Sequence, residues 1–310
     1  MKVAVVGDVI LDHYVWGDTE RLSPEAPVVV VDVMQDTWFA GGAANVAIDA
    51  AQLDSKVLLF GSTGSDEASA TLSNMLLDDD VDFRRSQAAE GAPTIVKSRV
   101  VARGQQLIRI DRNGNPQLYR PSLSFLKRML DTIKSVDCLI ISDYARGFLD
   151  DNILHSLIES ARSQKKFVAV DYKPRRKLNF SNPTLLTANR SEAFALAEMS
   201  DDDPERLPID ALAEAIYRRY APEYLVVTLG KDGMFICKKA KPLKHIPTMA
   251  QEVCDPSGAG DAVTVALSLA MCAGADFVKA AKFANIAAGV VVGKMGSSTI
   301  SADELKSFKL

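Results

Sequence analysis

The chain has 310 residues, of which 47% are hydrophobic and 25% charged, so it contains enough apolar material to bury a large core. Its formal net charge of −4 excludes a general attraction to nucleic acid or to an anionic membrane surface. No apolar run is long enough for a membrane span or a secretory leader, and we therefore expect a globular cytoplasmic protein.

Short runs rich in β-branched residues alternate with amphipathic stretches along the chain. The runs are expected to be strands, at residues 3–6, 56–60, 138–142, 167–171, 184–187 and 224–229. The stretches are expected to be helices, at residues 43–53, 68–78, 122–135, 151–164, 190–198 and 208–220. Because continuous apolar strands are covered on both faces, this order predicts a mostly parallel sheet flanked by helices, in a single α/β domain over residues 1–310.

A second kind of strand interrupts this order in the first third of the chain. Residues 28–33, 94–101 and 106–111 alternate apolar and polar side chains, as strands do when one face of their sheet meets water. We therefore expect a small lid of β-strands beside the main sheet, inserted at about residues 11–40 and 92–112.

Two polar motifs frame the first part of this lid. Asp8 and Asp12 follow the first strand, where open α/β sheets bind ligands, and carboxylates are good acceptors for sugar hydroxyls. The segment Gly41-Gly42-Ala-Ala-Asn45 combines close backbone approach with an amide that can donate and accept. Capping by the carboxylates and helix packing by the glycines are the alternatives.

A cationic group occupies the second part of the lid. Lys97, Arg99, Arg103 and Arg109 cluster there, together with Gln105. In an acidic chain such a group suits a phosphorylated substrate, because arginine binds phosphate through two parallel hydrogen bonds. Protection of an exposed strand edge is the alternative interpretation.

Two later segments follow strands and suit a nucleotide. Asn189 and Glu192 stand three residues apart at the start of a helix, where they could orient magnesium-bound water or simply cap the helix. Residues 228–233 could line a nucleotide or form a hairpin turn.

The segment Asp255-Pro-Ser-Gly-Ala-Gly-Asp261 runs directly into an apolar helical stretch. A glycine-rich turn that opens a helix directs backbone N–H groups and the positive end of the helix dipole at one point, which suits a phosphate in transfer. Asp261 would then stand beside that charge as a base, or would merely cap the helix.

The order of these motifs resembles that of the ribokinase, or PfkB, family of sugar kinases, over essentially the whole chain. Residues 40–45 resemble the first signature of the family and residues 255–261 its second. Within the family, the chain is similar to the kinases of D-glycero-β-D-manno-heptose 7-phosphate at residues 7–12, 21–27, 105–111, 142–147 and 287–294. Arg146 stands where these kinases usually have lysine.

The resemblance implies a ribokinase-like fold and an ATP-dependent kinase that produces the heptose 1,7-bisphosphate. It implies that Asp261 is the catalytic base and that Gly258, Ala259 and Gly260 form the anion hole. The implied nucleotide contacts are Lys173, Asn189, Arg190, Ser191, Glu192, Thr228, Gly230, Gly233 and Asn285, with Glu192 near Mg²⁺ through water. The implied sugar-phosphate contacts are Asp8, Asp12, Gly41, Gly42, Asn45, Lys97, Arg99, Arg103, Gln105, Arg109 and Asp143.

The same resemblance implies a homodimer formed through the lid, and a separate nucleotidyltransferase acting on the product. The dependence on a monovalent cation stays open at this point. Two other functions also stay open: a PfkB kinase for another sugar, sugar phosphate or nucleoside, and a sensor of sugar phosphate or nucleotide that has kept the fold without catalysis. The retention of Asp261 beside the glycines of the anion hole favours an enzyme, because a sensor needs neither.

Overall fold

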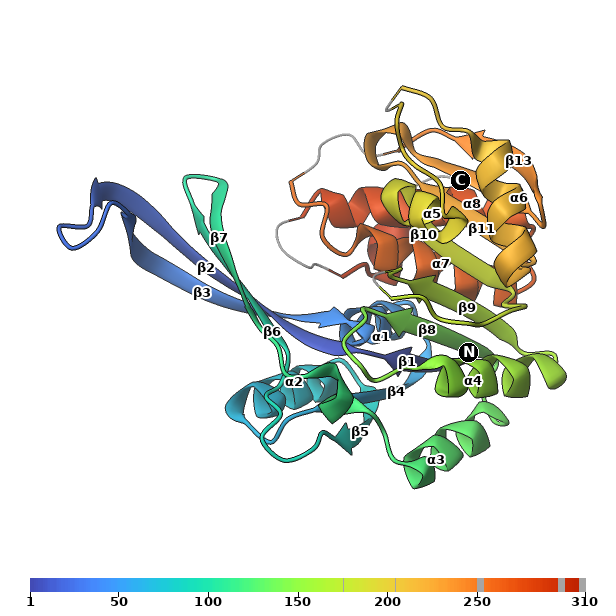
Figure 1. The fold of residues 1–310 in the computed structure, drawn as a ribbon, viewed down its shortest axis with the longest axis horizontal. Helices are drawn as coiled ribbons and strands as arrows, with labels where there is room; N and C mark the ends of the chain where they lie inside the picture. The colour runs from blue at the N-terminus through green and yellow to red at the C-terminus, as the bar shows by residue number, and fades with distance from the viewer. Residues whose placement is uncertain (175, 204, 250–253, 295–298, 307–310) are drawn as a thin grey trace.

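A central sheet of nine strands organises the larger part of the molecule, in the order β13-β12-β11-β10-β9-β8-β1-β4-β5 (Figure 1). The computed structural model describes residues 1–174, 176–203, 205–249, 254–294 and 299–306. The strands are β1 (Lys2–Gly7), β4 (Lys56–Thr63), β5 (Val81–Gln87), β8 (Cys138–Asp143), β9 (Phe167–Tyr172), β10 (Leu185–Asn189), β11 (Tyr224–Thr228), β12 (Met234–Lys238) and β13 (Lys241–Ile246).

The central strands of this sheet are parallel and buried on both faces. Residues 3–6 of β1 and 138–141 of β8 have no exposed surface, which explains their continuous apolar sequence. Within the described part of the chain, the antiparallel pairs of this sheet are β11 with β12 and β12 with β13, at one edge. The predicted α/β arrangement with a mostly parallel sheet is therefore confirmed.

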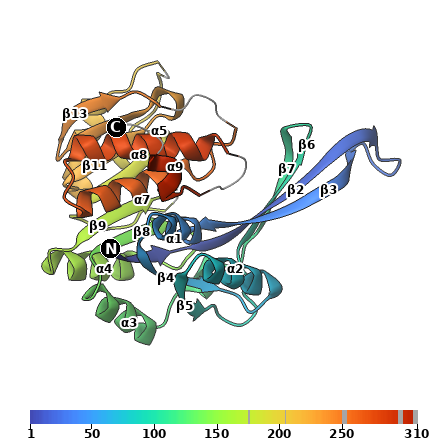
Figure 2. The same cartoon turned by 180° about the vertical axis from the view of Figure 1, so that it is seen from behind.

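Helices cover both faces of the sheet and make two separate apolar cores. One core includes α1 (Ala43–Gln52), α2 (Glu67–Asp78), α7 (Ala259–Cys272), α8 (Phe277–Val292) and α9 (Ala302–Lys306), which face the viewer in Figure 2. The other includes α3 (Leu123–Ile133), α4 (Asp151–Ser163), α5 (Arg190–Ala197) and α6 (Ile209–Tyr220). Among the described residues, no helix has the length and apolar character needed to cross a bilayer.

A second sheet of four strands extends away from this body, as both views show (Figures 1 and 2). Its order is β3-β2-β6-β7, and its strands are β2 (Val9–Leu22), β3 (Val29–Gly42), β6 (Val96–Ala102) and β7 (Gln105–Arg112). This sheet is the predicted lid. Its first strand begins two residues after β1 ends, so Asp12 lies in a lid strand rather than in a loop.

Three strands of the main sheet escaped prediction, namely β5, β12 and β13. All of them lie at or next to an edge of the sheet. In β5 and β13 few side chains are buried and the apolar pattern is weak, whereas β12 is a short apolar strand that was missed although most of its residues are buried. The lysine-rich residues 238–244 include most of β13. Lysines on an outer strand discourage pairing with another chain, which accounts for this composition.

Candidate active site

Two adjoining cavities lie at the carboxyl ends of the parallel strands. The larger has a volume of about 820 Å³ and is lined by the first turn of α7, the ends of β9, β10 and β11, and part of α8. The smaller, of about 470 Å³, is lined by lid residues and by the start of α5. Both cavities are lined by Tyr144, Lys173, Asn189 and Glu192, so these residues stand at their junction.

The start of α7 lies in the wall of the larger cavity. Gly258, Ala259 and Gly260 line it, and Gly258 has a φ of 83°, which glycine adopts without strain. A Cβ added at Gly260 would meet no atom within 4 Å, so the space beside this turn is open. The amides of a first helical turn have no partner inside the helix, and this end can therefore receive an anion.

Asp261 belongs to the same turn and also lines the larger cavity, although it is only 5% exposed. Its Oδ2 accepts a hydrogen bond from Asn45 Nδ2 at 2.9 Å, and its Oδ1 accepts one from the Tyr144 hydroxyl at 3.0 Å. Burial and the charge of Asp171 raise the pKa of Asp261 to about 6, against the opposing effects of Lys173 and the two hydrogen bonds. The geometry gives α7 a fixed carboxylate that can take up a proton near neutral pH.

Lys173 follows β9 and links the two cavities. Its ammonium lies 3.0 Å from Asp171 Oδ1 and 3.1 Å from Glu192 Oε1. Burial opposes its charge, but Asp171, Glu192 and Asp261 together outweigh that effect and raise its pKa, so it stays protonated. A permanent cation therefore stands beside Asp261, where phosphate charge would need compensation.

Asn189 and Glu192 form a reciprocal cap at the start of α5. Asn189 Oδ1 accepts the Glu192 amide at 2.9 Å, and Glu192 Oε2 accepts the Asn189 amide at 2.8 Å. The capping interpretation of this motif is thus correct for the protein as described. Glu192 Oε1 bonds Lys173 instead, and both residues line the cavities, so the cap does not remove them from the site.

Replacement of Asn189 by alanine should lower the free energy of unfolding by about 1 kcal/mol, because the Glu192 amide loses its acceptor. Asn189→Ser should restore most of this loss, since serine caps helices as well as asparagine does. Urea denaturation of both variants measures the difference. Equal stability of the alanine variant and the parent chain would contradict a stabilising role for the cap.

The predicted nucleotide residues mostly line the larger cavity. Thr228, Gly230, Gly233 and Asn285 all do so. A Cβ at Gly233 would lie 2.0 Å from the carbonyl oxygen of Ile246, so this glycine also serves close packing. The segment 228–233 is a hairpin turn as well, since it joins the antiparallel strands β11 and β12.

Arg190 and Ser191 differ from that group. Arg190 bonds Asp201 through Nε and Nη2 and lines neither cavity. Its predicted nucleotide contact is therefore not supported by its position. Ser191 lines the smaller cavity, and its hydroxyl donates to Asn189 Oδ1 at 2.8 Å.

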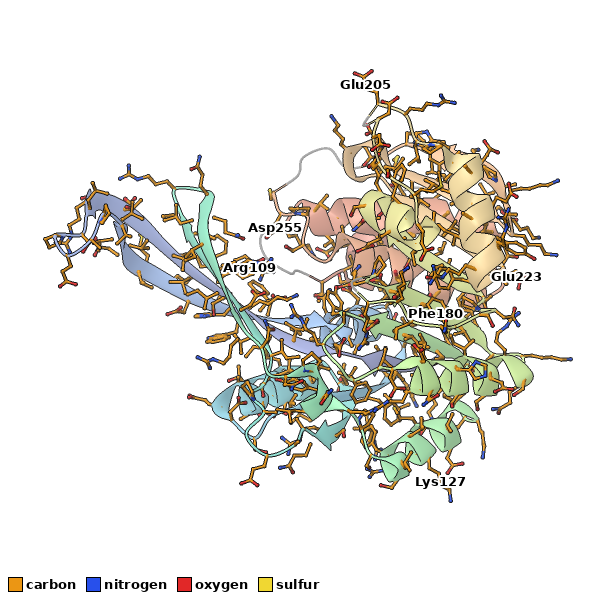
Figure 3. The ribbon with its side chains drawn as sticks, viewed as in Figure 1. Arg109, Lys127, Phe180, Glu205, Glu223 and Asp255 are labelled. Carbon is orange, nitrogen blue, oxygen red and sulfur yellow. The ribbon has the colours of Figure 1, made fainter. Side chains whose placement is uncertain are left out.

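The smaller cavity is rich in positive charge. Lys97 and Arg109 reach it from the lid, Arg146 from the loop after β8, and Lys173 from the junction. Arg146 Nη2 lies 3.8 Å from Asp111, and its buried Nε has no hydrogen-bond partner among the described residues. Figure 3 shows Arg109 on the lid strand and Asp255 on the facing segment before α7. An anionic group such as a phosphate suits this cavity.

Other predicted lid contacts lie away from both cavities. Arg99 is bonded to Asp12 at 2.6 Å, and Arg103 to Asp18 at 2.6 Å. Arg103 sits in the turn between β6 and β7 with a φ of 50°, and Gln105 is exposed beside it. The positions of Arg103 and Gln105 do not support direct substrate contact in this conformation.

The predicted sugar contacts at the lid base are largely engaged with other groups of the protein. The Asp12 carboxylate lies against Gly41, where a Cβ would come within 2.2 Å of Oδ2, while Gly42 has a φ of 58°. These glycines therefore allow the lid strand to pass close to Asp12. Asp8 and Asp143 are buried beneath the loop after β8 and line neither cavity.

Comparison with known proteins identifies the family. The sequence profile of the "pfkB family carbohydrate kinase" matches residues 1–304. The chain belongs to this family. The predicted class, a carbohydrate kinase, is thereby confirmed.

Relatives and solved structures agree with this assignment. "Bifunctional protein HldE" of Helicobacter hepaticus is 37% identical over 99% of this chain, and its namesake from Pseudomonas aeruginosa strain LESB58 is 40% identical over 98%. The chain spans 63% of the length of each of these relatives. The fold is similar to phosphofructokinase-2 from Escherichia coli, with a TM-score of 0.77, 18% identity and coverage of 99% and 97% of the two chains. The fold is also similar to ribokinase from Thermotoga maritima, with a TM-score of 0.74, 24% identity and coverage of 98% of each chain. The ribokinase-like fold is confirmed.

The residues of this PfkB-family site that were not predicted include Tyr144, Arg146 and Asp171. Each lies at or just after the carboxyl end of a strand, which is the signal that could have found them. Tyr144 and Arg146 even belong to a segment that resembles heptose phosphate kinases. Nothing local in the sequence shows that they reach α7 and the lid.

Proposed function

We propose that the chain is an ATP-dependent kinase that phosphorylates the anomeric hydroxyl of D-glycero-β-D-manno-heptose 7-phosphate to give the 1,7-bisphosphate. The observation that carries the proposal is the position of Asp261. It lies in the first turn of α7, beside Lys173, where a nucleotide-sized cavity adjoins a cationic one. A phosphoryl donor in the larger cavity and a phosphorylated acceptor extending into the smaller would meet at this carboxylate.

The cationic cavity favours an acceptor that already carries a phosphate. Lys97, Arg109 and Arg146 supply positive charge there, and burial lowers the pKa of Lys97, so an anion nearby would stabilise its charged form. The choice of heptose among phosphorylated sugars rests on the sequence resemblance. Another sugar phosphate is the second candidate that the same cavity supports.

The chain's own residues suit phosphoryl transfer, which depends mainly on positioning and on stabilisation of spread negative charge. Asp261 accepts the proton of the attacking hydroxyl. The first-turn amides of α7 and the ammonium of Lys173 hold the charge of the phosphoryl group between donor and acceptor. Asn45 and Tyr144 keep the Asp261 carboxylate in one orientation.

Magnesium fits this site as a partner of the nucleotide. Among the described residues, no group of three or more His, Cys, Asp or Glu side chains could enclose a metal ion. Mg²⁺ is commonly held by one or two carboxylates together with phosphates and water, and Glu192 is the carboxylate we propose for it, through water. When bound, Mg²⁺ would neutralise phosphate charge. A monovalent cation stays a prediction.

The rate should depend on pH through Asp261. Because the raised pKa of about 6 belongs to a base that works in its ionised form, kcat/KM should be constant above that pH and fall about tenfold per unit below it. Buffer-matched initial rates between pH 5 and pH 8 measure this limb. A limb near the ordinary carboxyl value of about 4 would contradict the environment described for Asp261.

Magnesium-dependent ADP release across a panel of sugars, sugar phosphates and nucleosides tests the proposal. Heptose 7-phosphate should give the highest kcat/KM. Preference for another acceptor would replace the substrate but keep the kinase. Binding of sugar phosphate and nucleotide without any ADP release would instead favour the sensor.

We propose further that the lid forms a homodimer. Its sheet and the loop between β2 and β3 expose apolar side chains that a monomer would leave in water, namely Leu22, Val28, Val29, Val33, Met34, Trp38, Leu107, Ile108 and Ile110. Sedimentation equilibrium should give twice the chain mass. A monomer at micromolar concentration would contradict this interface. The predicted separate nucleotidyltransferase stays a prediction.

A further inference from the structure

The loop after β8 carries a tyrosine to the base of the site. The Tyr144 hydroxyl donates to Asp261 Oδ1 at 3.0 Å, across 117 positions of sequence. Its ring lies beneath two cations, with Lys97 Nζ at 5.0 Å and Lys173 Nζ at 5.4 Å from the ring centroid. Tyr144 thus touches Asp261 and both cationic side chains at the junction of the two cavities.

The buried carboxylate of Asp8 binds the backbone of this loop. Its Oδ2 accepts the backbone amides of Tyr144 and Arg146, each at 2.9 Å, and its Oδ1 accepts the amide of Phe148 at 3.0 Å. The Asp8 side chain is only 2% exposed, so these bonds are shielded from water. A carboxylate has about four acceptor positions, so one that accepts three loop amides has little capacity left for a sugar hydroxyl.

Asp143 supports the same loop. Its Oδ1 accepts the Ala145 amide and an Arg176 Nη2 hydrogen, both at 3.0 Å. Burial and the neighbouring charge of Asp8 raise the pKa of Asp143 to about 7. Gly147 completes the turn with a φ of 111°, and a Cβ there would lie 1.9 Å from the carbonyl oxygen of Pro116. The loop therefore has one well-determined path.

We propose that Tyr144 is a positioning residue for Asp261, and that Asp8 acts through the 144–148 loop to place it rather than through contact with the sugar. The hydroxyl bond fixes one carboxylate oxygen, as Asn45 fixes the other, and each oxygen of this cavity-lining carboxylate keeps a lone pair that can accept a proton. The bond also favours the ionised carboxylate, because a donor stabilises the charged form. This proposal rests on the proposed function in one respect, that Asp261 is the base.

The effect of the Tyr144 hydroxyl on the ionisation of Asp261 can be measured separately from the effects of the other charged groups nearby. Within the described residues, the titratable side chains that act on Asp261 are Asp171 and Lys173 at the end of β9 and Tyr144 after β8. Asp49 on α1 is a further carboxyl group, whose own pKa is raised by burial and by Asp261. Asp171 opposes the ionisation of Asp261 through like charge, whereas Lys173 favours it. A variant that removes only the hydroxyl of Tyr144 leaves all of these groups in place.

Tyr144→Phe is the variant that tests the proposal. It keeps the ring beneath Lys97 and Lys173 but removes the bond to Asp261 Oδ1. The acidic limb of kcat/KM should move upward by about one pH unit, because a hydrogen bond to a charged group is lost. At pH 8 kcat should fall by about three- to tenfold while KM for ATP stays within twofold. If the acidic limb of kcat/KM in Tyr144→Phe lies at the same pH as in the parent chain, the positioning role of Tyr144 is overturned.

Tyr119→Phe is the matched control, since Tyr119 is a buried tyrosine whose hydroxyl donates to the carbonyl oxygen of Pro93 at 2.6 Å, outside both cavities. The acidic limb of kcat/KM in Tyr119→Phe should lie at the same pH as in the parent chain. Asp8→Asn should reproduce the shift of Tyr144→Phe, because an amide presents N–H groups to at least one of the loop amides. If the acidic limb of kcat/KM in a folded Asp8→Asn variant lies at the same pH as in the parent chain, the proposed role of Asp8 is overturned.

A second readout keeps this proposal separate from the proposed function. The carboxyl carbon of Asp261 can be titrated by NMR in protein labelled at aspartate, with Asp261→Asn used to assign the signal. Its pKa should be higher in Tyr144→Phe than in the parent chain even if no acceptor sugar is ever phosphorylated. Equal pKa values would reject the proposal, whereas absence of ADP release in the parent chain would reject only the kinase assignment.

Discussion

Asp261→Asn is expected to lower kcat by about 10²- to 10⁴-fold, the usual contribution of a well-placed proton acceptor. The amide has almost the same size and its oxygen can still accept a hydrogen bond from Asn45 or Tyr144, but it cannot take up a proton from an alcohol. KM for ATP and for the sugar phosphate should change little. Steady-state ADP release, with each substrate varied in turn, measures the effect.

Asp276→Asn provides the control for this variant. Asp276 is exposed and caps α8, the neighbouring helix, and asparagine caps a helix as well as aspartate does. Its kcat should equal that of the parent chain. Near-parental turnover of Asp261→Asn would remove Asp261 from the role of base, and with it the central step of the proposed mechanism.

Arg146→Met is expected to raise KM for the sugar phosphate by about 10- to 100-fold, because it removes a charge-assisted contact to phosphate. The Arg146 side chain is 18% exposed and pairs only weakly with Asp111, at 3.8 Å. Methionine keeps much of its apolar stem, so the fold should lose little. Initial rates with varied sugar phosphate, at saturating ATP, give the value.

The Arg103→Met variant tests whether Arg103 contacts the substrate, as the sequence predicted, or lies outside both cavities, as in the structure. Arg103 pairs with Asp18 in the lid turn and lines neither cavity, so its substitution should leave KM within twofold. A rise as large as that of Arg146→Met would restore the predicted contact for Arg103. With an unphosphorylated sugar, Arg146→Met should have no comparable effect, and a similar loss there would argue against a phosphate site in the smaller cavity.

Local sequence patterns predicted the main layers well and the edges poorly. β1 and β8 were found because burial on both faces forces continuous apolar residues. β13 was missed because an edge strand is free to carry lysines. The helix starting near Asp261 was found from its glycine turn, whereas the neighbours of its carboxylate come from distant elements.

The arginines of the lid show why the sequence alone does not predict which residues line a cavity. Its arginines look equivalent in sequence, since all lie on or between alternating strands. The structure separates them: Arg109 lines the smaller cavity, Arg99 is bonded to Asp12, and Arg103 lies in the turn. Arg99 and Arg109 are paired across β6 and β7 and therefore share one face of the lid. The partner that each side chain meets in the folded protein, and not the alternation along the strand, separates them.

The sequence by itself determined the α/β layers, the lid and the glycine turn before α7, because burial, alternation and backbone freedom are local properties of short segments. Only the tertiary structure decided that Tyr144 reaches Asp261, that Arg146 joins the lid cations, and that Asp8 bonds backbone amides. These contacts depend on strand order and on the path of one loop. Side chains far apart in the chain meet there because neighbouring parallel strands end at the same edge of the sheet.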